Sequence, residues 1–127
     1  MERDVAITEL EHSASAPREA RRFAAATLDA WGLADLADDV TLLVSELVSN
    51  VVHHTDGGAV LRLSRTPQRL RCSVIDGGGH APHRRAPAPT DPSGRGLLLV
   101  DALSISWGST TTRGRTEVWF EVSIRDS

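Results

Sequence analysis

The chain has 127 residues, 14 cationic side chains that are all arginine, and 17 aspartates and glutamates, which gives a formal net charge of −3. This length predicts one domain, over residues 1–127, with a sizeable core. The single Cys72 excludes a disulfide framework, and the mild acidity argues against direct contact with nucleic acid. No apolar run reaches the roughly 18–20 residues of a membrane span, and the N-terminal residues lack a signal-peptide pattern, so we expect a cytoplasmic protein.

The first half of the chain predicts one strand and two helices. Residues 4–10 alternate between apolar and polar side chains, as in a strand. Ser15 and Pro17 predict the start of a helix, with Ser15 as its cap, and Gly32 predicts its end. A second helix is predicted from about Asp35 to His54, because apolar residues recur there at helical spacing. These residues are Val40, Leu43, Val44, Leu47 and Val51.

Two strands and a long irregular segment follow. Residues 59–65 and 70–76 predict strands that are joined by a turn around Pro67. Residues 77–95 then concentrate glycines together with four of the six prolines of the chain. A segment of this length without regular structure, inside a compact domain, is usually functional or disordered.

The last part of the chain predicts a short helix from Gly96 to Leu103 and a closing hairpin. Residues 104–108 and 116–124 form the two strands of this hairpin, with an alternating apolar face that includes Phe120. The order of elements predicts an α+β fold, a two-layer sandwich with helices on one face of a mixed, largely antiparallel sheet. The glycine patterns of Rossmann and P-loop nucleotide sites are absent from the sequence.

Glu46 and Asn50 are the first residues that suggest chemistry. They are four residues apart and therefore share one side of the second predicted helix, away from its apolar stripe. The oxygen of an asparagine side chain is a neutral ligand suited to Mg²⁺, and a glutamate can orient and deprotonate a hydroxyl group. Taken alone, the same pair also fits an ordinary solvated helix face.

Asp76 ends a predicted buried strand and opens into three glycines. A carboxylate only accepts hydrogen bonds, so it can bind the exocyclic amino group of adenine, whereas it would repel the carbonyl oxygen of guanine at the same place. The glycines, among them Gly78, let the backbone approach a flat ring closely. A plain Asp-Gly turn is the other interpretation of this motif.

The segment Gly94-Arg95-Gly96 opens the third predicted helix. Free N–H groups and the helix dipole at such an N-terminus favour the binding of phosphate. The same pattern is also typical of a helix that begins after a flexible loop.

In this order and spacing, the three motifs resemble the N, G1 and G2 boxes of the Bergerat-fold ATPases, which include gyrase, heat-shock chaperones and histidine kinases. The short length, the run SELVSNVVHHT, and the segment GRGLLLVDALSISWG with TEVWF close behind it resemble most the anti-sigma-factor serine/threonine kinases. The resemblance covers nearly the whole chain. It implies a Bergerat ATP-binding fold with ATP and Mg²⁺ as cofactors.

Carried over to this sequence, the resemblance implies a role for each motif residue. Glu46 would be the general base and Asn50 the Mg²⁺ ligand. Asp76 would bind adenine, with Gly78 under the base. Gly94, Arg95 and Gly96 would surround the phosphates.

The sequence departs from the family pattern at His80, which stands where the G1 box usually has its last glycine. The departure could narrow the loop over the nucleotide or weaken the site. The chain also offers no lysine for the phosphates, so arginine would serve, with Arg84 and Arg85 as further possibilities beside Arg95.

Two functions follow from these observations. The resemblance implies a protein serine/threonine kinase that binds a sigma factor or an anti-sigma antagonist, phosphorylates the antagonist, and forms a homodimer. The alternative is a regulatory module that binds nucleotide or a partner without catalysis. Glu46 together with Asn50 favours the kinase, whereas His80 favours the alternative.

Overall fold

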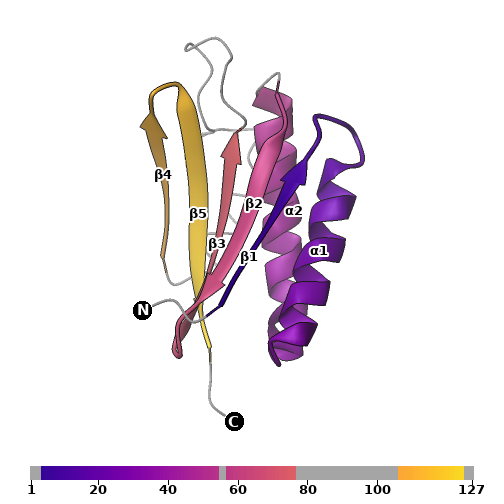
Figure 1. Ribbon diagram of the computed structural model, residues 1–127, viewed down its shortest axis with the longest axis vertical. Coiled ribbons are helices and arrows are strands. Elements are labelled where there is room, and N and C mark those ends of the chain that lie inside the picture. The colour runs from indigo at the N-terminus through magenta and orange to yellow at the C-terminus, as the bar shows by residue number, and fades with distance from the viewer. Residues whose placement is uncertain (1–3, 55–56, 77–105, 125–127) are drawn as a thin grey trace.

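A computed structural model describes residues 4–54, 57–76 and 106–124 of the chain (Figure 1). Two helices lie on one face of a five-stranded sheet, as predicted from the order of elements. In chain order, the elements are β1 (Asp4–Leu10), α1 (Ala16–Ala30), the 3-10 turn η1 (Ala34–Leu36), α2 (Ala37–His54), β2 (Ala59–Arg65), β3 (Arg69–Asp76), β4 (Ser106–Thr112) and β5 (Arg115–Ser123).

The sheet has the strand order β1-β2-β3-β5-β4, and all four pairings between the described strands are antiparallel. The largely antiparallel sheet is therefore confirmed. The turn between β2 and β3 is confirmed as well, because the N–H of Thr66 donates to the carbonyl of Arg69 at 2.9 Å around Pro67.

The core lies between the sheet and the two helices. Every second residue of a strand points to the same face, so β5 buries Val118, Phe120 and Val122 under the helices. The predicted apolar stripe of α2 is confirmed, since each of its five members is at most 4% exposed. Neither described α-helix contains a segment long and apolar enough to cross a bilayer.

Helix α1 begins and ends where the sequence predicts, but its N-terminus is held differently. Ser15 is the N-cap residue as predicted, but its hydroxyl donates to the carboxylate of Glu19 at 2.9 Å, so the expected capping bond to a backbone N–H is absent. Pro17 in the first turn still favours the helix start. Gly32 has φ of +74°, which confirms it as the residue that ends the helix.

The closing hairpin is longer than predicted in its first strand. Strand β4 runs from Ser106 to Thr112 rather than over residues 104–108, because its turn is formed by the two residues Arg113 and Gly114. Both turn residues have positive φ, 55° and 79°, as a two-residue hairpin turn requires. The predicted loop over 77–95 and the helix after it lie outside the described residues.

Charged side chains of β3 and β5 lie on the face of the sheet that the helices leave open. The guanidinium group of Arg71 lies over the ring of Trp119, 4.1 Å from its centre. The same arginine forms an ion pair with Glu121, at 3.4 Å between Nη1 and Oε2. These charged and aromatic groups are partners of one another on the surface of the sheet.

Candidate functional site

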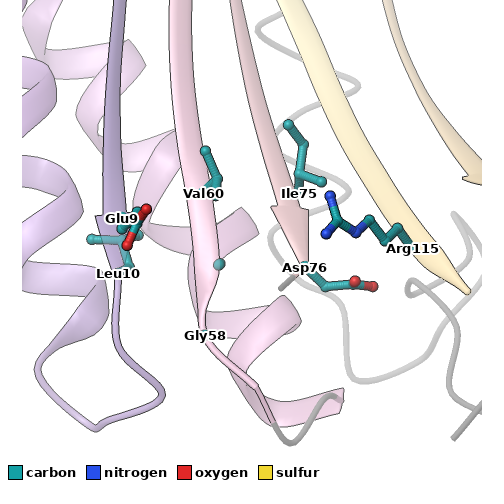
Figure 2. A pocket seen from close by; sticks show the side chains of 8 residues that line it. Glu9, Leu10, Gly58, Val60, Ile75, Asp76 and Arg115 are labelled. Carbon is teal, nitrogen blue, oxygen red and sulfur yellow. The ribbon is translucent and has the colours of Figure 1, made fainter. Parts of the chain in front are cut away.

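The end of the sheet where β2 begins and β3 ends contains an open cleft. Ala59 and Asp76 are paired in register at this end. Eight residues line the cleft, which has a volume of about 470 Å³: Glu9, Leu10, Gly58, Ala59, Val60, Ile75, Asp76 and Arg115. Figure 2 shows Asp76 at the tip of β3, with the side chain of Arg115 reaching across from β5.

Gly58 allows β1 and β2 to approach each other closely beside this cleft. A Cβ atom built on Gly58 would collide with the main-chain carbonyl oxygen of Leu10. Because that oxygen belongs to the backbone, it cannot move aside as the end of a side chain could. The glycine at this position is therefore required by the packing of the strand end.

Asp76 is buried at the helix-covered face, with only 3% of its surface exposed. Its Oδ2 atom accepts a hydrogen bond from the backbone N–H of Thr116, at 2.9 Å. A buried carboxylate is costly unless hydrogen bonds compensate for the water that it loses, and this N–H supplies such a bond. The bond also limits the rotation of the carboxylate, so Asp76 presents its acceptor in a defined direction.

Glu46 and Asn50 lie on α2, and both are half-buried. The Nδ2 atom of Asn50 is buried and has no hydrogen-bond partner in the structure as far as it is described. A buried amide without a partner costs about 1–3 kcal/mol, which a bound ligand could recover. The amide oxygen and nitrogen exchange places when the group turns over, so the same side chain can offer its oxygen to a cation.

Helix α2 packs against β2 and β3, and the side chain of Asp76 points to the face that this helix covers. The structure therefore places Glu46, Asn50 and Asp76 on the same side of the sheet, and their roles stay predictions. Four further predicted site residues lie outside the described residues: Gly78, Gly94, Arg95 and Gly96. The same holds for His80, Arg84 and Arg85.

Two residues of this region were not singled out from the sequence. Thr116 is 4% exposed, and its hydroxyl oxygen lies 3.2 Å from that of Thr111 on β4. Thr116 stands beside Asp76, and Thr111 is its exposed partner on the edge strand β4. The sequence did contain one signal for Thr116. It lies two residues before Val118, the first of the alternating apolar residues of β5, and therefore shares their face of the sheet.

A family model described as the histidine kinase-like ATPase domain matches residues 10–122. The chain is also similar to the solved RsbU and RsbW domains of Rv1364c from Mycobacterium tuberculosis, with a TM-score of 0.66 and 23% identity. That match covers 97% of this chain but only 34% of the other, so the chain spans about a third of that structure. A comparison with curated proteins finds no match.

A second solved structure, the histidine kinase AdeS from Acinetobacter baumannii, matches with a TM-score of 0.54 and 13% identity. This match covers 98% of the chain and 70% of AdeS. At these identities, the two structures show a shared fold, and the Bergerat fold inferred from the sequence is confirmed. Because the family model spans most of its length, the chain belongs to the histidine kinase-like ATPase domain family.

Proposed function

We propose that this protein binds Mg-ATP and transfers the γ-phosphate to a serine or threonine of a protein partner. The partner would be an anti-sigma antagonist, and the protein would sequester a sigma factor when the antagonist is absent. The observation that carries this proposal is the buried carboxylate of Asp76, held by the N–H of Thr116 on the face that α2 covers. Family membership implies ATP binding, and the resemblance of the sequence to the anti-sigma kinases supports the partners.

The proposed role of Asp76 is to select adenine. Its carboxylate accepts a hydrogen bond from the 6-amino group of the base. Guanine would present a carbonyl oxygen at that place, and two acceptors facing each other without a proton repel. ATP should therefore bind in preference to GTP.

The proposed roles of Glu46 and Asn50 concern the phosphates. Bound Mg²⁺ would neutralise charge on the triphosphate as the phosphoryl group is transferred. Asn50 would hold this ion through its amide oxygen with the amide group turned over, since its buried Nδ2 atom has no partner within the described part of the chain. Glu46 orients the hydroxyl group of the protein substrate and accepts its proton.

The location and assembly of the protein follow from the same proposal. ATP and the two partners are cytoplasmic, so the protein would act in the cytoplasm. The resemblance to anti-sigma kinases also implies a homodimer. Neither direct contact with nucleic acid nor association with a membrane is part of the proposal.

The second candidate function is a regulatory module that binds nucleotide or a partner without phosphoryl transfer. It is favoured by His80, which replaces a glycine of the G1 box. The two functions differ in a single measurable step, the transfer of phosphate.

The test combines calorimetric titration of Mg-ATP with transfer of labelled γ-phosphate to proteins that co-purify with the chain. Glu46→Gln should retain ATP binding while transfer slows by roughly 10²–10⁴-fold, the usual contribution of a positioned base. Asn50→Ala should weaken the binding of Mg-ATP itself. The matched control is Glu11→Gln, an exposed glutamate before α1 that lies outside the site.

Three outcomes would contradict the proposal, each at a different step. If Glu46→Gln transfers phosphate at the unmodified rate, the assigned base is wrong. If the unmodified protein binds Mg-ATP but labels no co-purifying protein, the non-catalytic module is supported. If it binds no Mg-ATP at all, the nucleotide site itself is refuted.

A further inference from the structure

A second cleft, with a volume of about 440 Å³, lies beside the turn between β4 and β5. We call it the turn cleft, and its lining residues are Ile75, Thr110, Arg113, Arg115 and Glu117. Three of them stand in one row across β3, β5 and β4: Ile75, Glu117 and Thr110. Because neighbouring residues of a strand point to opposite faces, this row faces away from Asp76 and Thr116. The turn cleft therefore opens on the face of the sheet that the helices leave uncovered.

The two arginines of the turn cleft differ from Arg71, which lies on the same face. Arg71 forms an ion pair with Glu117, at 3.8 Å between Nη2 and Oε2. Arg113 and Arg115 are exposed, and neither side chain forms an ion pair or a hydrogen bond with a residue of the described ranges. Since the carboxylate of Glu117 already has a partner, the two arginines leave the turn cleft with positive charge.

The turn itself does not explain why Arg113 is an arginine. Its φ of 55° lies in the left-handed region. A two-residue hairpin turn prefers asparagine, aspartate or glycine at such a position, because longer side chains strain the backbone there. Strain of this kind clusters where a side chain has a function. A second arginine two residues later lines the same cleft, so binding of a ligand is the function that fits.

The chemistry of the turn cleft fits an acidic segment of a protein. Guanidinium groups bind carboxylates through paired N–H···O hydrogen bonds. Figure 2 shows the side chain of Arg115 close to Ile75, which offers apolar surface beside the charge. Nucleic acid fits less well, because its row of phosphates would meet the carboxylate of Glu117 and a chain with a net charge of −3.

We propose that the turn cleft is a docking surface for an acidic segment of a protein partner. Carboxylates of the segment pair with Arg113 and Arg115, and an apolar side chain of the segment contacts Ile75. This inference goes beyond the proposed function, because it requires neither a bound nucleotide nor the transfer of phosphate. It assigns a contact with a partner to the face of the sheet opposite the helices.

The test measures the fluorescence anisotropy of a short labelled peptide in which glutamate and leucine alternate. Arg113→Gln and Arg115→Gln should each weaken its binding about threefold, the loss of one exposed ion pair, and together about tenfold. Glu117→Gln should instead tighten binding about threefold, because it removes a negative charge from the cleft and releases Arg71. The same peptide with glutamine in place of glutamate should not bind.

The matched controls lie further along the same face of the sheet. Arg69 pairs with Glu121 there, at 3.2 Å between Nη1 and Oε1. Arg69→Gln removes the same charge as each cleft variant, and Glu121→Gln removes the same charge as Glu117→Gln. Both controls should leave the affinity for the peptide unchanged, because neither residue lines the turn cleft.

The inference is refuted if the peptide does not bind, or if Arg69→Gln weakens it as much as Arg113→Gln does. It is also refuted if a single-stranded oligonucleotide binds more tightly than the peptide and loses affinity in the cleft variants, since nucleic acid would then be the ligand. Ile75 and Arg115 also line the first cleft, so displacement of the peptide by Mg-ATP would assign the arginines to the nucleotide site instead. If the protein binds the peptide but no Mg-ATP, the proposed function fails and this inference stands.

Discussion

The two ends of the helix-covered face each hold a charged side chain, but they hold it in different ways. At one end, Arg65 donates from Nη1 to the carbonyl of Trp31 at the C-terminus of α1, at 2.8 Å. Its Nε atom also lies 3.6 Å from the carboxylate of Asp4. At the other end, Asp76 accepts from the neutral backbone N–H of Thr116.

The different partners of Arg65 and Asp76 suggest that one residue serves the stability of the fold and the other serves ligand binding. Arg65 meets the negative end of a helix and a carboxylate, so its charge is balanced by groups that close the fold. Asp76 accepts a hydrogen bond from a backbone N–H and lines the cleft at the end of the sheet. We therefore expect substitutions at Arg65 to change mainly the free energy of unfolding, and substitutions at Asp76 to change mainly the affinity for nucleotide.

The largest expected effect is that of Asp76→Asn on ATP binding. Asparagine keeps the size of the side chain and can still accept the N–H of Thr116, but it loses the charge that attracts the amino group. The binding free energy should fall by about 1.5–3 kcal/mol, the range for a hydrogen bond to a charged group. Calorimetric titration measures this loss.

The control for this substitution is Asp29→Asn, which changes an exposed aspartate on α1. It should leave the affinity for ATP unchanged. Equal affinity of the unmodified protein for ATP and GTP would remove Asp76 as the selecting residue. A large loss of stability in Asp76→Asn, without a loss of affinity for ATP, would show that Asp76 stabilises the fold, as Arg65 does.

The next effect is that of Arg65→Met on stability. Methionine retains much of the apolar stem but leaves the carbonyl of Trp31 without its charged donor. The free energy of unfolding should fall by about 2 kcal/mol, measured by urea denaturation. The affinity for ATP, measured on the folded protein, should stay the same.

Arg69→Met is the matched control for Arg65→Met. The side chain of Arg69 is 58% exposed, and it pairs with Glu121 on the open face. An exposed pair of this kind contributes about 0–1 kcal/mol, so its loss should be much smaller. If the two arginine variants lose equal stability, the contact of Arg65 with the end of α1 contributes no more to the free energy of unfolding than the exposed ion pair of Arg69.

The smallest effect concerns Cys72, which lies on β3 between the two ends and is fully buried. Burial raises the pKa of its thiol above the ordinary value, so the thiol stays protonated in the folded protein. The unfolded chain loses this proton above about pH 8.5, which favours unfolding as the pH rises. Between pH 8 and pH 9.5, the loss of stability due to this group should be about 1 kcal/mol.

Cys72→Ala provides the comparison, because it keeps every other titrating group. The unmodified protein should lose about 1 kcal/mol more stability than Cys72→Ala over this pH interval, measured by urea denaturation. Parallel pH profiles for the two proteins would show that the thiol also ionises in the folded state.

The sequence predicted most of the described elements because their signals are local. The stripe of α2 and the alternation in β5 depend on residues within a few positions of one another, and neighbouring residues impose these periods. The prediction was weaker where a side chain had a choice of partners. Ser15 could cap the helix or bind Glu19, and the spacing alone did not decide between them.

The sequence predicted which residue types form the candidate site. It predicted their arrangement in space only in part. Glu46, Asn50 and Asp76 were singled out because carboxylates and an amide at these spacings suit a nucleotide and its cation. The structure places all three on the side of the sheet that the helices cover, and their roles stay predictions. Thr111 and Thr116 were missed, because threonine is common in strands and carries no distinctive signal of its own.

The sequence by itself determined the helices, the strands and the residues with suitable chemistry, because each depends on nearby positions in the chain. Only the tertiary structure decided that the N–H of Thr116 meets the carboxylate of Asp76, forty residues away. It also decided that Arg65 reaches the end of α1, thirty-four residues before it. Such contacts depend on strand register and on how the helices pack, and a shift of one residue in register would turn these side chains to the opposite face.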